Sequence, residues 1–306
     1  MERNLTTGSV LRNILLFSLP YLLSYFLQTL YGMADLFIIG QFEGVASTTA
    51  VSVGSQVMHM ITVMLVGLAM GSTVTIAQAV GGEKRQRAAD AVGSTATIFL
   101  ALSVVLTLVL LRFVYPIVSV MSTPAEAVAG TAQYLTICFL GIPCITAYNI
   151  ISAIFRGMGD SKSPMYFIAV ACAANIALDY LFMGAMRLGP VGAALGTTLA
   201  QAISVLVAFI AIRRRRSVAV SRGDLRPRRD VMGQILGIGM PVALQDGLIQ
   251  IAFILITVIA NLRGLTDAAA VGIVEKLISF LFLVPSSMLS TVSAIGAQNI
   301  GAVCFG

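Results

Sequence analysis

The feature that most constrains the fold is a succession of apolar runs, each long enough to cross a lipid bilayer. A membrane-spanning helix needs about 20 apolar residues, and in hydrocarbon a helix satisfies its own backbone hydrogen-bonding groups. The composition agrees, since 58% of the 306 residues are hydrophobic and only 10% are charged. We therefore expect an all-α multi-pass membrane protein with about eight transmembrane helices. The apolar runs cover residues 12–40, 46–79, 92–115, 127–153, 162–185, 189–212, 231–262 and 268–298.

The distribution of basic residues predicts the orientation. If the N-terminus lies in the cytoplasm, all of the 19 Lys and Arg residues fall on the cytoplasmic side except Arg112, Arg187, Arg263 and Lys276. This is the arrangement that the positive-inside rule favours. The Arg-rich stretch 213–230 is then a basic cytoplasmic linker. It lacks the interleaved aromatic residues of a nucleic-acid surface, so we expect no nucleic-acid partner.

A repeat flanks that linker. The stretch Ile14–Pro20 recurs as Ile235–Pro241. A Ser-Thr-Val triplet followed by Ala-Gln also occurs twice, at residues 72–78 and at residues 290–298. Six helices precede the linker, so the second copy starts on the same side of the membrane, as in transporters built from two parallel repeats. We expect a complete six-helix lobe at 1–212, the linker at 213–230, and a partial second lobe with helices seven and eight at 231–306.

Two acids lie inside the first six apolar runs. Asp35 is midway through the first run, and Asp179 lies in the fifth, four residues after Asn175. On a helix, Asn175 and Asp179 project from one face, a turn apart. A charge at membrane depth costs at least about 2.5 to 3.5 kcal/mol, so such residues indicate function. The alternative for Asp35 is a structural acid bonded to a neighbouring helix.

Five short motifs follow one another along nearly the whole chain. They are Met33–Gly40 after Pro20, Phe155–Lys162, Asn175–Asp179, Gly192–Thr198 and Gln298–Ala302. In this order they resemble the multidrug and toxic compound extrusion (MATE) transporters, most closely the bacterial branch. Members of that family have twelve helices, so we expect this chain to be truncated after helix eight. The resemblance also implies the bacterial cytoplasmic (inner) membrane, a small organic substrate, and Na⁺ or H⁺ as the coupling ion without a cofactor.

The resemblance assigns roles to particular residues. It implies that Asp35, Asn175 and Asp179 line one cavity, and that the site continues to the backbone of Ala193 and the hydroxyl of Thr197. Oxygen ligands of this kind suit a hard cation such as Na⁺. Two carboxylates in one dry pocket cannot both stay ionised without a cation, so sodium and protons would compete for the site. The sequence leaves open which of them couples.

Methionine and proline supply further candidates. Met33, Met58 and Met64 are candidates for a pliable substrate cavity, because promiscuous binders often use Met. Core packing is the alternative for them. Pro20 and Pro241 occupy matching places in the repeat, and a proline inside a helix removes a backbone hydrogen bond. We expect both to act as hinges.

The favoured function is a secondary antiporter that exports amphipathic or cationic organic compounds by alternating access. A flippase for lipid-linked oligosaccharides has a similar fold, but it needs basic residues in its cavity. An inactive truncated fragment is another alternative. Gly157–Asp160 fits the GxGD pattern of intramembrane aspartyl proteases, although Asp160 lies in a loop. No Walker loop, metal-ligand spacing or GxSxG elbow occurs, so we expect no enzyme. The sequence does not identify a partner chain.

Overall fold

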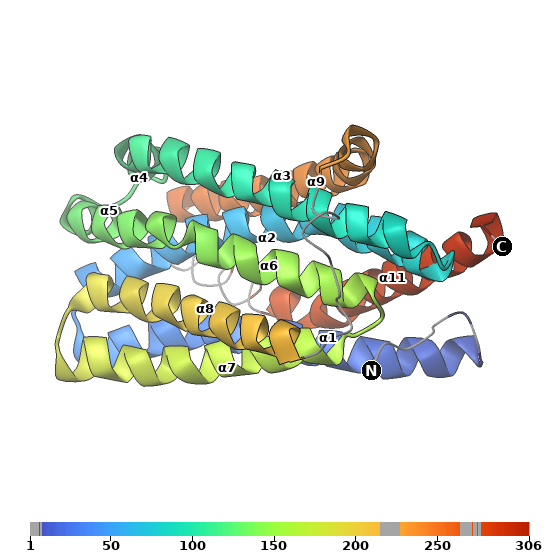
Figure 1. Cartoon of the computed structure of the whole chain (residues 1–306). Helices are drawn as coiled ribbons and strands as arrows, with labels where there is room; N and C mark the ends of the chain where they lie inside the picture. Colours follow the sequence, from blue (N-terminus) through green and yellow to red (C-terminus); the bar gives the residue numbers. More distant parts are fainter. Residues whose placement is uncertain are drawn as a thin grey trace.

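The computed structural model describes residues 6, 8–214, 227–263, 271, 274 and 277–305, and all of its regular structure there is helical. The helices run roughly parallel to one another in an elongated bundle (Figure 1). They are α1 (Val10–Phe42), α2 (Val45–Gly81), α3 (Arg85–Arg112), α4 (Val114–Val120), α5 (Ala125–Leu140), α6 (Ile142–Gly157), α7 (Lys162–Asp179), η1 (Tyr180–Ala185), α8 (Gly189–Arg214), α9 (Arg229–Arg263) and α11 (Leu283–Phe305).

The prediction of an all-α membrane protein with about eight spans is confirmed. In the described part of the chain, seven helices are long and apolar enough to cross a membrane, and an eighth span is formed if α5 and α6 count as one. These two helices meet at an angle of 48°. The bend follows from Gly141 and Pro143, because a proline cannot donate to the carbonyl four residues earlier and its ring collides with that carbonyl.

Helix α2 forms the centre of the bundle. In its most apolar window 61% of the residues are buried, against 28% for α3 and 11% for α9. It packs most extensively against α9, and it also contacts α3, α5, α6 and α11. A Cβ atom at Gly71 would overlap the backbone of Ile235 and Gly239 on α9. Small residues thus let the two backbones approach closely.

The crossing of α2 and α11 reflects the internal repeat. Gly81 on α2 lies against the backbone of Gln298, and Gly301 on α11 lies against the backbone of Gln78. Each glycine follows its own glutamine by three residues, so the same contact is made twice with the roles exchanged. Such reciprocal contacts are typical of a two-fold relation between similar units.

The boundaries of the expected lobes are only partly visible. Helix α8 extends to Arg214, and α9 begins at Arg229. The central part of the expected linker, residues 215–226, lies outside the described residues. The division into lobes therefore stays a prediction.

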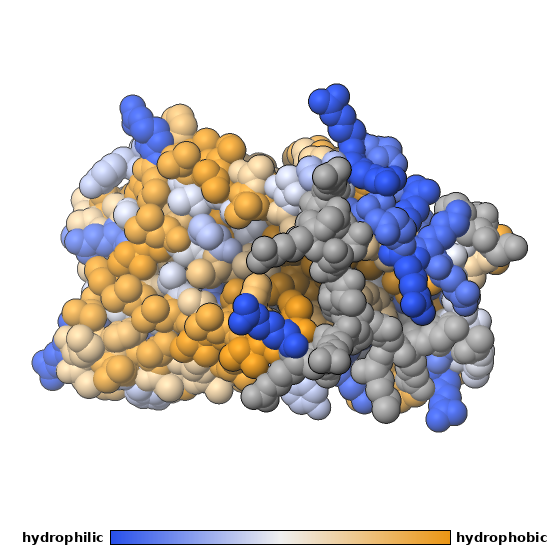
Figure 2. Space-filling model, viewed as in Figure 1, coloured by the Kyte–Doolittle hydropathy of each residue, from blue (hydrophilic) through white to orange (hydrophobic). Residues whose placement is uncertain are grey.

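Polar and apolar surfaces are separated along the bundle. Hydrophilic side chains gather at one end, and apolar side chains cover much of the rest of the visible face (Figure 2). Exposed apolar residues such as Leu100, Leu108 and Leu206 belong to this lateral surface. The polar end carries the starts of α3, α7 and α9 and the ends of α2 and α6. Which side of the membrane it faces stays a prediction.

Candidate functional site

Helices α1, α7 and α8 pack against one another (Figure 1). They hold the predicted acids in the interior. Asp35 on α1 is 3% exposed, and Asn175 and Asp179 on α7 are fully buried. The Asp35 carboxyl group adjoins the side chains of Asp179 and Asn175. The three side chains that the sequence placed on two separate helices therefore meet in one place.

Helix α8 closes this cluster from a third side. The Thr197 hydroxyl donates a hydrogen bond to Asp35 Oδ2 over 3.1 Å. Ala193, one turn earlier on α8, is fully buried. Gly196 faces α7, where a Cβ atom would overlap Oδ1 of Asp179. The small-residue face of α8 therefore leaves room for the Asp179 carboxyl group.

The cluster contains an unusual number of polar atoms without a hydrogen-bond partner. Among the described residues, Asp35 Oδ1, both carboxylate oxygens of Asp179 and both amide atoms of Asn175 are buried and unpaired. Gln201 Oε1, one turn after Thr197 on α8, is also buried and unpaired. Each buried, unsatisfied polar group costs about 1 to 3 kcal/mol, so native structures rarely retain such groups without a functional reason. A proton or a cation at this point would satisfy the oxygen atoms of the two carboxyl groups and of the Asn175 amide.

The donor set narrows the kind of ion. It offers two carboxyl groups and neutral oxygens, and in the described part of the chain no three His, Cys, Asp or Glu side chains cluster together. Soft transition metals prefer thiolate and imidazole ligands, whereas hard cations prefer carboxyl, carbonyl and hydroxyl oxygens. The residues therefore fit Na⁺ or a shared proton.

Two further residues belong to this neighbourhood. Tyr31 on α1 adjoins Asp35 and Thr197 as well as Gln201 on α8. Neither Tyr31 nor Gln201 was predicted from the sequence. Tyr31 precedes Asp35 by four residues and Gln201 follows Thr197 by four, so helical spacing places each on the same helix face as a predicted site residue without singling it out.

Helix α7 ends at Asp179, and a π-helical turn, η1, follows directly. The wider turn changes the backbone hydrogen-bond pattern next to the buried acid. Turns of this kind inside helices are frequent at functional sites. No residue pattern in the stretch Tyr180–Ala185 indicated it beforehand.

The three predicted methionine candidates have different surroundings. Met58 packs in the main apolar core, Met33 is 40% exposed, and Met64 lies against Gly247 on α9. Their shared role in a substrate cavity stays a prediction.

The hinge role of the two prolines also stays a prediction. Pro20 is buried inside the continuous helix α1, and Pro241 is exposed inside α9.

Fold and site together define a multi-pass membrane protein with a buried, paired-acid site of the kind found in ion-coupled transporters. The MatE family model matches residues 20–181, about half of the chain. The chain therefore belongs to the MatE family of multidrug efflux transporters and not to a class of enzymes. This confirms the resemblance seen in the motifs.

Similar proteins agree with this assignment. The chain is 30% identical over 302 residues to the probable multidrug resistance protein YoeA of Bacillus subtilis, covering 96% of this chain and 65% of that protein. It is 24% identical to the multidrug export protein MepA of Staphylococcus aureus, covering 96% and 65%. A solved MOP superfamily transporter from Pyrococcus furiosus superposes with a TM-score of 0.90 at 24% identity, covering 98% and 67%. The chain thus spans about two thirds of the length of the proteins it matches.

Proposed function

We propose that this protein is a secondary antiporter, which exports amphipathic or cationic organic compounds in exchange for Na⁺ or H⁺. The observation that carries the proposal is the buried cluster of Asp35, Asn175, Asp179 and Thr197, with its unpaired carboxyl and amide atoms. Two adjoining acids buried among membrane-spanning helices lower the stability of the fold, so their presence indicates a functional role such as ion coupling.

Coupling follows from the position of the cluster among three helices. A ligand shifts a conformational equilibrium only by its difference in affinity between the two states. Asp35 comes from α1, Asp179 from α7 and Thr197 from α8, so any relative movement of these helices changes the ligand set. An ion bound here would therefore favour the state in which all three helices converge.

The substrate class rests on the similar proteins. Two of them are described as multidrug resistance or multidrug export proteins. Hydrophilic side chains gather at one end of the visible face (Figure 2), and Lys84, Arg85, Arg87, Arg228 and Arg229 all lie where α3 and α9 begin. This distribution favours neutral or cationic compounds over the anionic substrates of a flippase.

Export of ethidium from proteoliposomes under an imposed Na⁺ or H⁺ gradient tests the proposal. Asp35→Asn and Asp179→Asn keep the shape of each side chain but remove its charge, and each should reduce gradient-driven export to the rate seen without a gradient. Thr197→Val should impair sodium-driven export more than proton-driven export, because only the metal needs the hydroxyl oxygen.

The matched control is Glu126→Gln, which removes a carboxylate from an exposed position in the first turn of α5. This variant should export at the wild-type rate. If both aspartate variants matched the wild type in rate and ion dependence at equal reconstitution, the proposed coupling site would be wrong.

A further inference from the structure

An arginine near the end of α6 is surrounded by aromatic and hydroxyl groups. Arg156 is partly buried, and its Cζ atom lies 4.6 Å from the centre of the Tyr21 ring on α1. Tyr25 and Tyr148 also lie close to it. The ring of Tyr21 attracts the cation through its face. This contact leaves the N–H groups of the guanidinium, which form a fork of five donors, without acceptors.

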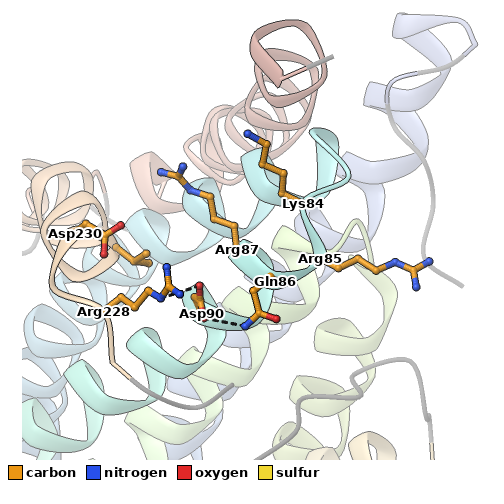
Figure 3. A pocket seen from close by; sticks show the side chains of 8 residues that line it. Lys84, Arg85, Gln86, Arg87, Asp90, Arg228 and Asp230 are labelled. Carbon is orange, nitrogen blue, oxygen red and sulfur yellow. Dashed lines mark hydrogen bonds and ion pairs between the residues drawn. The ribbon is translucent and has the colours of Figure 1, made fainter. Parts of the chain in front are cut away.

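No carboxyl group in the described part of the chain pairs with Arg156. Asp160 follows it by four residues, but the Asp160 carboxyl group accepts from the backbone N–H groups of the first two residues of α7, each over 3.0 Å. The basic cavity of about 400 Å³ where α3 and α9 begin is different, because Arg228 there lies 3.1 Å from Asp90 (Figure 3). Buried charges are normally paired, so Arg156 calls for an anion.

Hydroxyl groups gather at the same place. Tyr148, Ser152 and Arg156 follow one another at intervals of four residues, so they project from one face of α6. Tyr148 Oη and Ser152 Oγ are buried and have no hydrogen-bond partner among the described residues. Tyr25 adjoins Tyr148, and its hydroxyl lies 2.9 Å from Ser290 Oγ on α11. A hydroxyl donates a hydrogen bond as readily as it accepts one, so this cluster is rich in donors and contains no acid.

The space beside Arg156 limits the size of the anion. The residues that line it include Tyr21, Asn149, Arg156 and Ser290. The centre of a water-sized particle has about 10 Å³ in which to move there, so a monatomic ion fits and a phosphate group does not. We propose that Arg156 and its neighbouring hydroxyl groups bind a chloride ion, which links α1 and α6 to α11.

This chloride site is separate from the acid cluster. Both clusters use α1, but Tyr21 precedes Asp35 by 14 residues, which is about 21 Å along a helix. The remaining partners come from α6 and α11 instead of α7 and α8. Chloride binding is therefore measured independently of cation coupling and of transport.

Bromide tests the position of the site directly, because it resembles chloride and scatters X-rays anomalously. In crystals of the detergent-solubilised protein grown in NaBr, an anomalous peak should lie next to the Arg156 guanidinium. The absence of a peak there would overturn the proposal.

Thermal unfolding measures the affinity. The melting temperature of the wild type should rise when chloride replaces gluconate at constant ionic strength, because an ion that binds only the folded state stabilises it. Arg156→Gln should weaken chloride binding at least tenfold, since it removes the charged donor. If that variant does not fold, Tyr148→Phe keeps the ring, removes one hydroxyl, and should weaken binding about fivefold.

The control is Lys162→Gln, which removes an exposed cation from the start of α7 at the same end of the bundle. It should bind chloride within about twofold of the wild type, because salt screens the effect of a distant surface charge. Equal loss in Lys162→Gln and Arg156→Gln would contradict the proposal. An equal rise in melting temperature with sulfate, which is too large for the cavity, would also contradict it.

Discussion

The geometry of the acid cluster depends on a residue without a side chain. Gly196 on α8 faces α7 at the point where a Cβ atom would overlap Oδ1 of Asp179. Asp179 is fully buried, and neither of its carboxyl oxygens has a hydrogen-bond partner. The position of Asp179 relative to Asp35 is therefore set by a backbone surface.

Gly196→Ala should displace the Asp179 carboxyl group and destabilise the protein by about 1 to 3 kcal/mol, the usual cost of overpacking. Thermal unfolding in detergent, with and without Na⁺, measures both the loss of stability and the loss of ion response. The matched control is Gly237→Ala in α9, where nothing lies within 4 Å of the new methyl group. That change should be neutral or stabilising by up to about 1 kcal/mol, since Ala favours a helix over Gly. Wild-type stability and ion response in Gly196→Ala would contradict this role.

The sequence alone was enough to predict which acids form the site, but not which residues surround them. Asp35, Asn175 and Asp179 stand out because a polar group at membrane depth is costly on any helix, whatever its neighbours. Gly196, Tyr31 and Gln201 gain their roles only from the way that α1, α7 and α8 face one another, and helical spacing alone leaves that choice open. The methionines show the same limit, because a side chain that suits a cavity also suits a core.

Among the helices, the reciprocal crossing of α2 and α11 is tightly constrained. Gly81 and Gly301 each lie against the backbone of the opposite helix. Backbone atoms cannot rotate away as a flexible side chain does, so a methyl group at either position forces the helices apart.

Gly301→Ala should therefore destabilise the protein by about 1 to 3 kcal/mol. Its control is Gly296→Ala, which lies on the same helix and has nothing within 4 Å of the added methyl group. The free energy of unfolding of both variants, from denaturant titration in detergent, provides the comparison. Equal values for the two variants would show that the helices do not meet at Gly301.

Local sequence explains the number of helices better than their shape. Apolar runs predicted every span that the structure describes, because length and hydropathy act within one segment. The break at Gly141 agrees with the proline that follows it. The π-helical turn after Asp179 has no such signal in its local sequence, and it lies where α1 and α8 pack against α7 and η1.

At the scale of the whole molecule, the described residues form two separate clusters of charged side chains. The interior holds an acid cluster that joins α1, α7 and α8, and the polar end holds a basic cavity that joins α3 and α9. The repeat that the sequence revealed explains why α9 and α11 pack around α2 as they do. Orientation in the membrane depends on charges outside the helices and does not follow from their packing.

The central claim is that Asp35 and Asp179 bind the coupling ion, and ion-dependent unfolding tests it most directly. A ligand that binds only the folded state stabilises it by RT ln(1 + [L]/Kd), about 2.7 kcal/mol at 100 times Kd. The melting temperature of the wild type should rise when choline is replaced by Na⁺ at constant ionic strength, or change with pH if protons occupy the site. Asp35→Asn/Asp179→Asn should lose that response, and Glu126→Gln should keep it. A double variant that retained the wild-type response to both ions would contradict the account.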